Sequence, residues 1–97
     1  ITLPVSLLPN MKGTGKNMTG QKTLSSRIDY YCRLQQISYY ELAFRSAVPL
    51  PTLMHILDGS TRNPGVFTIV KLCNGFGIAA SEFFDTKEFE EIDFDAQ

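Results

Sequence analysis

Apolar residues recur every three or four positions through most of the chain, which is the spacing of amphipathic α-helices. Leu24, Ile28, Tyr31 and Leu34 form the first such stripe, in a helix predicted to begin at Thr23. No credible run alternates apolar and polar residues in the manner of a half-buried strand. The pattern therefore predicts an all-α protein, and the signals that follow divide it into five helices.

The second helix is marked by a capping pattern. Ser38 and Glu41 have the spacing of a capping box, in which the serine hydroxyl binds the Glu41 amide and the carboxylate reaches back. This helix is predicted to end near Ser46, and Val48 and Pro49 then form a tight connection.

The third helix carries Pro51 in its first turn, where proline is tolerated. Leu53, Ile56 and Leu57 are its predicted core positions. Asp58 and Gly59 are predicted to end it, since glycine readily takes the left-handed conformation found after helices.

A fourth helix is predicted to start at Asn63 and Pro64, an N-cap residue followed by proline at the first position, and to end at Gly77. A last turn or two at about 80–84 completes the five. The apolar positions predicted to face the core from the fourth helix are Phe67, Val70, Leu72, Cys73 and Phe76.

These signals divide the 97 residues into three parts. Residues 1–22 contain prolines and glycines without any helical period, which predicts a flexible arm, within which Met11 and Met18 are plausible native starts. Residues 23–85 form one helical domain, and residues 86–97 form an acidic tail. The content of 43% hydrophobic and 20% charged residues is ordinary for a globular protein, and no run of apolar residues is long enough to span a membrane.

The net charge of −1 conceals a separation of opposite charges. Residues 11–78 carry eight basic and three acidic side chains, a net charge of +5, whereas residues 79–97 carry seven acidic and one basic, a net charge of −6. A basic body favours a polyanionic partner, although charge that serves only solubility is an equal alternative.

The sequence contains few residues that could form a catalytic site or a metal site. Only Cys32 and Cys73 are present, without a CxxC pair, and both fall inside apolar helical patterns, as structural thiols do. His55 is the single histidine, which argues against a metal site or a catalytic triad, and no phosphate-binding glycine pattern occurs. We therefore expect a non-enzyme without cofactor, metal or small-molecule ligand, in a reducing cytoplasm.

Residues 27–84 resemble the Cro and phage-repressor type of helix-turn-helix regulator, the xenobiotic-response-element family. The spacing matches that of the family without a gap over residues 27–84, and the motifs that carry the match lie between Ile37 and Phe84. The matching motifs are Ile37-Ser38, Leu42-Ala43, Ala47-Val48, Thr52-Leu53, Asp58-Gly59, Asn63-Pro64, Phe76-Gly77-Ile78 and Glu82-Phe83-Phe84. The resemblance implies a five-helix lambda-repressor-like domain whose second and third helices form the helix-turn-helix.

The resemblance further implies a bacterial or phage-like transcriptional regulator that binds double-stranded DNA as a homodimer, with residues 50–57 in the major groove. It places Tyr39 against a phosphate at the start of the second helix, and His55 on the outward face of the third. The full set of implied DNA contacts is Tyr39, Leu50, Pro51, Thr52, His55, Thr61, Arg62 and Asn63. For Tyr39, His55 and Arg62 the alternatives are a half-packed ring, an exposed helix residue and a solvated loop charge.

Several positions depart from the family pattern. Leu50 and Pro51 stand where polar base-contacting residues are usual. Discrimination between DNA sequences is therefore expected to depend on His55, Met54 and DNA shape. Ala47 stands where the family favours glycine, and if this residue is left-handed, alanine costs about 1 kcal/mol relative to glycine.

Cys32 and Leu57 replace a buried Arg–Glu pair, which predicts that they pack together. Because both charged residues are replaced together, no unpaired charge is buried in the core.

Two questions stay open at this stage. A protein-interaction module, antitoxin-like or an adaptor, that keeps the fold without specific DNA binding is the competing function, favoured if Leu50, Pro51, Leu53 and Met54 form an exposed apolar patch. In the tail, Phe89, Ile92 and Phe94 alternate with acids. A frayed, solvated end that repels DNA is preferred there over a segment that forms a dimer.

Overall fold

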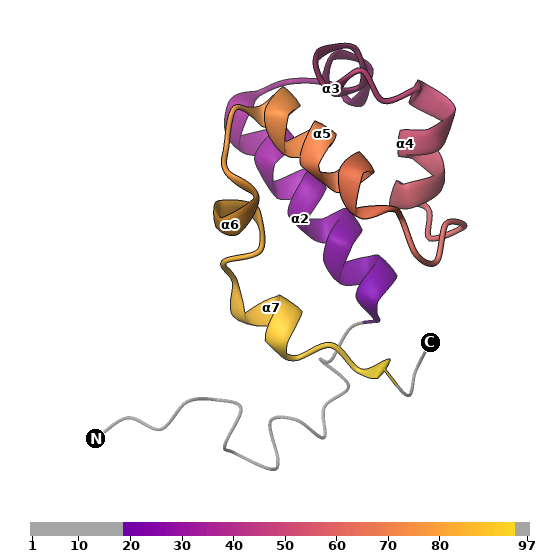
Figure 1. The fold of residues 1–97 in the computed structure, drawn as a ribbon, viewed down its shortest axis with the longest axis vertical. Helices are drawn as coiled ribbons and strands as arrows, with labels where there is room; N and C mark the ends of the chain where they lie inside the picture. The colour runs from indigo at the N-terminus through magenta and orange to yellow at the C-terminus, as the bar shows by residue number, and fades with distance from the viewer. Residues whose placement is uncertain (1–18, 95–97) are drawn as a thin grey trace.

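The computed structural model describes residues 19–94, and all regular structure in this part is α-helical, as predicted (Figure 1). The predicted five helices are present, and a sixth short helix, α7, follows them within the predicted tail. The predicted arm lies outside the described residues except for residues 19–22. The helices are α2 (Gly20–Gln35), α3 (Tyr39–Ser46), α4 (Leu50–Leu57), α5 (Val66–Phe76), α6 (Ala80–Phe83) and α7 (Lys87–Glu90).

Helix α2 begins at Gly20, three residues before the predicted start at Thr23. The Thr19 side chain accepts a hydrogen bond from the Lys22 amide at 3.2 Å and caps the helix. This cap extends the helix back to Gly20, so residues 20–22 are helical although they were predicted to belong to the flexible arm. At the other end, Leu34 is 62% exposed. It therefore lies outside the buried stripe of α2, contrary to the prediction.

Helix α5 also differs from its prediction. It begins at Val66 after an N-cap at Gly65, and the Ile69 amide makes the first helical hydrogen bond, to the Gly65 carbonyl at 3.2 Å. Asn63 and Pro64 lie in the preceding loop, since this dipeptide favours turns as well as helix starts. Ile69 belongs to the buried stripe of α5, while Phe67, on the opposite side of the helix, is 81% exposed. The prediction that Phe67 is a core residue is wrong.

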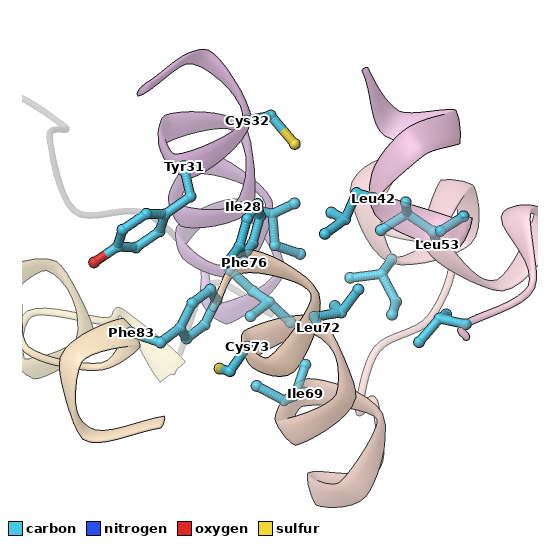
Figure 2. Close-up of a cluster of buried hydrophobic side chains, with 14 residues drawn as sticks. Ile28, Tyr31, Cys32, Leu42, Leu53, Ile69, Leu72, Cys73, Phe76 and Phe83 are labelled. Carbon is cyan, nitrogen blue, oxygen red and sulfur yellow. The ribbon is translucent and has the colours of Figure 1, made fainter. Parts of the chain in front are cut away.

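One hydrophobic core joins the helices (Figure 2). Ile28 from α2, Leu42 from α3 and Leu53 from α4 converge on Leu72 of α5, and all four side chains are completely buried. Phe83 from α6 closes the core on the side of α2 that faces away from α3 and α4 (Figures 1 and 2). The core thus fixes α3 and α4 as a pair at one end of the molecule.

Helices α3 and α5 approach each other closely at Gly75. Gly75 lies against Ser46, and a Cβ atom added at Gly75 would sit 2.9 Å from the Ser46 Cβ. The buried Ser46 hydroxyl donates a hydrogen bond to the Leu42 carbonyl at 2.7 Å, so no polar group is lost at this contact. Only glycine at position 75 allows the two backbones to come this close.

Two polar side chains of α2 bind the ends of other helices. The Arg27 guanidinium donates to the carbonyls of Phe83 and Glu82 at 2.7 and 2.9 Å, and the Gln35 amide donates to the Phe76 carbonyl at 2.7 Å. Carbonyls at helix C-termini lack partners within the helix, so these bonds satisfy α5 and α6 while fixing them to α2.

The first part of the predicted tail is folded. Thr86 caps α7 by accepting a hydrogen bond from the Glu88 amide at 3.5 Å. Phe89 is half-buried against the core, and its ring lies 6.1 Å from that of Phe83 and 4.8 Å from that of Phe84. The preference for a frayed end is therefore wrong for residues 87–90, because the aromatic side chain finds apolar partners on the helical domain.

Candidate nucleic-acid interface

The α3–α4 corner is built by local signals that the sequence carries. The Ser38 hydroxyl accepts from the Glu41 amide at 3.0 Å, which confirms the serine half of the capping box. The Glu41 carboxylate instead forms an ion pair with Arg45, one turn further along α3. Ala47 ends the helix with φ 59°, the left-handed conformation in which alanine is strained relative to glycine.

Pro49 then serves as the N-cap residue of α4 and Pro51 lies in its first turn, as predicted. Three residues, 47–49, therefore connect the two helices. A connection this short holds α3 and α4 in a fixed relative orientation.

The outward face of α4 carries four of the predicted contact residues, in two different environments. Pro51, Thr52 and His55 are exposed, whereas Leu50 is half-buried and packs against the core. Leu53 is completely buried, which removes it from the apolar patch that would favour the competing function. The exposed face of α4 therefore carries both polar and apolar side chains.

The C-terminal end of that face is acidic. The Asp58 carboxylate accepts from the Ser60 amide at 2.8 Å, and this hydrogen bond holds its pKa below the usual range. His55 Nδ1 lies 3.9 Å from a carboxylate oxygen of Asp58, within reach of an ion pair when the imidazole is protonated. Thr61, the first residue of the predicted loop set, donates its amide to the His55 carbonyl at 3.1 Å.

Tyr39 does not offer a free hydroxyl. Its hydroxyl donates to Asp29 of α2 at 2.8 Å, and this bond together with burial raises the pKa of Tyr39. Asp29 is paired with Arg33 at 2.8 Å as well. The half-packed ring, the alternative to a phosphate contact, agrees with this environment, because the partner of the hydroxyl lies on another helix of the same chain.

Arg62 and Asn63 lie in the loop between α4 and α5, and both are exposed. The loop leads to the N-terminus of α5, where no side chain caps the first amides. Free amides at a helix N-terminus attract anions. Arg62 has no carboxylate partner among the ion pairs of residues 19–94, unlike Arg33 and Arg45.

Two exposed aromatic side chains were missed by the sequence analysis. Tyr40 and Phe44, both on α3, are 72% and 81% exposed. With Ala43, Val48 and Leu50 they line a shallow hollow of about 200 Å³ at the α3–α4 corner. The i, i+4 spacing of the two rings could have indicated this patch, since the buried stripe of α3 passes through Leu42 and Ala43.

The basic character of this region is lower than the residue count suggests. Arg27 is bound to the carbonyls at the end of α6, and its guanidinium also lies 4.9 Å from the Tyr31 ring centroid. Arg33 and Arg45 each share their charge with a carboxylate of the same helix. Among the four arginines of this part of the chain, Arg62 is the one whose guanidinium makes neither an ion pair nor a hydrogen bond within the described residues.

Neither cysteine is placed for chemistry. Cys32 and Cys73 are free thiols buried in the core. Burial raises the pKa of the Cys32 thiol to about 11, with a further contribution from the negative charge of Asp29, and burial also raises the pKa of Cys73. Both thiols are therefore protonated and unreactive at neutral pH. Residues 19–94 contain no group of three possible metal ligands.

Comparisons with known proteins add no family assignment. A scan against protein-family models, a search of curated proteins and a search of solved structures each found no match to this chain. Within residues 19–94, no helix is both long and apolar enough to cross a lipid bilayer.

Proposed function

We propose that this chain is a DNA-binding transcriptional regulator with a lambda-repressor-like arrangement of helices, in which α3 and α4 form a helix-turn-helix. The observation that carries the proposal is the α3–α4 corner, with its left-handed residue Ala47 and an α4 whose outer face is exposed. An exposed eight-residue helix held at a fixed angle at one end of a domain has the size to enter a major groove.

The loop after α4 supports the same orientation. Arg62 and Asn63 are exposed next to the free amides that begin α5, which together form a favourable environment for a phosphate group. Arg62 supplies affinity in this arrangement, and His55 supplies sequence discrimination.

DNA titrations at two salt concentrations test this proposal. Arg62→Ala should weaken binding equally for good and poor sequences, and should reduce the slope of log K against log salt by about 0.9, because one phosphate contact is lost. His55→Ala should instead narrow the difference between preferred and random DNA by about 1–3 kcal/mol. Thr52→Glu should abolish binding, since it places a carboxylate against the DNA.

A matched control is Lys71→Ala, which removes an exposed positive charge from α5 rather than from the loop. Its effect on the salt slope should be smaller than that of Arg62→Ala. Circular dichroism melts of each variant establish that the fold is intact. Unchanged binding in all three test variants, or no binding by the unaltered protein at low salt, would contradict the proposal.

A protein-interaction module is the second candidate, and one observation favours it. Tyr40 and Phe44 form an exposed aromatic pair beside the hollow at the α3–α4 corner, and aromatic side chains are enriched in protein interfaces. Phe44→Ala separates the two functions. In this variant, a regulator that binds DNA through α4 and Arg62 should keep the same slope of log K against log salt. A module that binds a protein through the hollow should instead lose its partner.

A further inference from the structure

A pocket of about 360 Å³ lies where the start of α2, the α4–α5 loop, α5 and the C-terminal segment meet. Its walls are mainly apolar. Leu24 and Ile69 are buried there, and Phe84 and Phe89 add two aromatic rings whose centroids lie 4.8 Å apart. Small-molecule sites have volumes of about 300–1,000 Å³ and mostly apolar walls with a few polar groups. The pocket therefore has the size and the surface of a small-molecule site.

A buried hydrogen-bond acceptor at this pocket has no partner. Gln21 is one of the lining residues, and its side-chain oxygen is buried without a hydrogen-bond partner within residues 19–94. Buried acceptors are nearly always satisfied. The terminal amide of glutamine turns about a bond with a broad torsional preference, so this oxygen can turn to meet a donor inside the pocket. An occupant of the pocket is therefore expected to carry an N–H or O–H group.

The pocket also has an unpaired positive charge. Arg62 is the only ionisable side chain among the described residues that line it. It is exposed, and its guanidinium makes no ion pair or hydrogen bond within residues 19–94. A guanidinium binds a planar carboxylate through two parallel hydrogen bonds. The uncapped N-terminus of α5 begins at Val66 in the same wall and favours the same negative charge.

We infer that this pocket binds a small organic acid, with its aromatic body against Phe84 and Phe89, an N–H or O–H donor towards Gln21 and its carboxylate towards Arg62. A dry cavity of about 150 Å³ holds benzene in another protein, so this pocket has room for a body of two rings. No such ligand is expected from the sequence, because the lining residues come from four separate stretches of the chain, 20–24, 62–70, 80–84 and 89–94.

The bound acid acts on DNA binding through Arg62. In the proposed function this guanidinium binds a DNA phosphate, and this part of the inference rests on that function. A carboxylate held in the pocket competes with the phosphate, since one guanidinium fork holds one planar anion at a time. The acid therefore acts as an inducer that releases DNA. Loss of one phosphate contact lowers the DNA association constant about fivefold at about 0.15 M salt.

Titration calorimetry of the full chain without DNA tests the site. The probe is indolepropionate, which combines an aromatic body, a ring N–H and a carboxylate, and its dissociation constant should be about 1 mM or lower. Indolepropanol lacks the carboxylate and N-methylindolepropionate lacks the donor, so each should bind at least about twofold more weakly. No saturable binding of indolepropionate, or an equal affinity for either of the other two compounds, would overturn the inference.

Variants locate the bound probe. Val70→Trp fills part of the pocket with a ring and should abolish binding, and Arg62→Ala should weaken binding about twofold to fivefold. Phe67→Ala is the matched control, because this exposed ring of α5 does not line the pocket, and its variant should bind as the unaltered protein does. Thermal melts establish that each variant is folded. Normal binding by folded Val70→Trp would place the probe elsewhere and overturn the inference.

DNA titrations with and without saturating indolepropionate test the coupling. The probe should lower the DNA affinity of the unaltered protein about fivefold and leave that of Arg62→Ala unchanged, because this variant has no phosphate contact to lose at position 62. Equal weakening in both proteins, or none in the unaltered protein, would overturn the coupling. A protein that binds the acid but no DNA would contradict the proposed function and leave the site established.

Discussion

At the scale of single residues, Gly75 determines how closely α5 can approach α3. Its hydrogen atom faces Ser46, whose Cα and backbone nitrogen lie 3.1 Å from the position of an added Cβ. Backbone atoms cannot move aside as a flexible side chain can. A methyl group at position 75 must therefore push the two helices apart.

We predict that Gly75→Ala lowers the free energy of unfolding by about 1–3 kcal/mol, the usual cost of overpacking a core. The gain in helix propensity from glycine to alanine, about 1 kcal/mol, offsets only part of this steric cost. Urea denaturation measures the change.

Gly65→Ala is the control for this prediction. A Cβ at Gly65 would meet only the Thr68 hydroxyl oxygen, at 3.9 Å, so its effect should be clearly smaller. Equal stability of Gly75→Ala and the unaltered protein would show that α3 and α5 can separate without cost.

At the scale of elements, α2 and α4 meet at one end of the core. Cys32 is buried on α2, and Leu57 is half-buried at the end of α4 against the same core. The family resemblance implies that these two side chains stand where other members carry a buried Arg–Glu pair, and so predicts that they pack together. Their direct contact remains a prediction, and a double variant can test it.

We predict that Leu57→Glu lowers the free energy of unfolding by about 1–3 kcal/mol, because a carboxylate loses solvent without gaining a partner. Adding Cys32→Arg should recover part of this loss if the two positions are neighbours. Met54→Glu, on the exposed side of α4, is the control and should change stability little. Thermal melts of the unaltered protein, Leu57→Glu, Cys32→Arg and the double variant measure the coupling. Purely additive losses would show that the two side chains are not neighbours.

At the scale of the whole molecule, the chain closes on itself through its C-terminal segment. Phe89 brings α7 against the core next to Phe83, and Arg27 binds the carbonyls of α6 from α2. The acidic segment is thus partly a structural element of the helical domain. Removing it would uncover aromatic surface as well as remove charge.

We predict that Phe89→Ala lowers the free energy of unfolding by about 1–2 kcal/mol, less than the 3–5 kcal/mol for a fully buried ring, because this ring is half-buried. Phe94→Ala removes a ring that is 73% exposed and should have a smaller effect. Hydrogen exchange should also be faster in residues 80–90 of the Phe89 variant. Identical melts for the two variants would contradict a packing role for Phe89.

The sequence by itself determined the helices and most of their ends. The cap at Ser38, the left-handed turn at Ala47 and the stop at Gly59 all depend on residues within about one turn of each other. Hydrophobic spacing likewise selected Leu42, Leu53 and Leu72 as core residues. Such signals are local, so they can be recognised without knowing how the helices pack.

Only the tertiary structure decided which partners distant residues find. Arg27 binds a carbonyl 56 residues away, and Tyr39 binds Asp29 on another helix, so neither side chain is as available as its type suggests. Phe67 and Leu34 fit a helical period but face outward, because the packing of α5 and α2 against the other helices sets which side of each helix meets the core. The spacing of apolar residues predicts that a helix has an apolar face, whereas the packing of the helices determines what that face contacts.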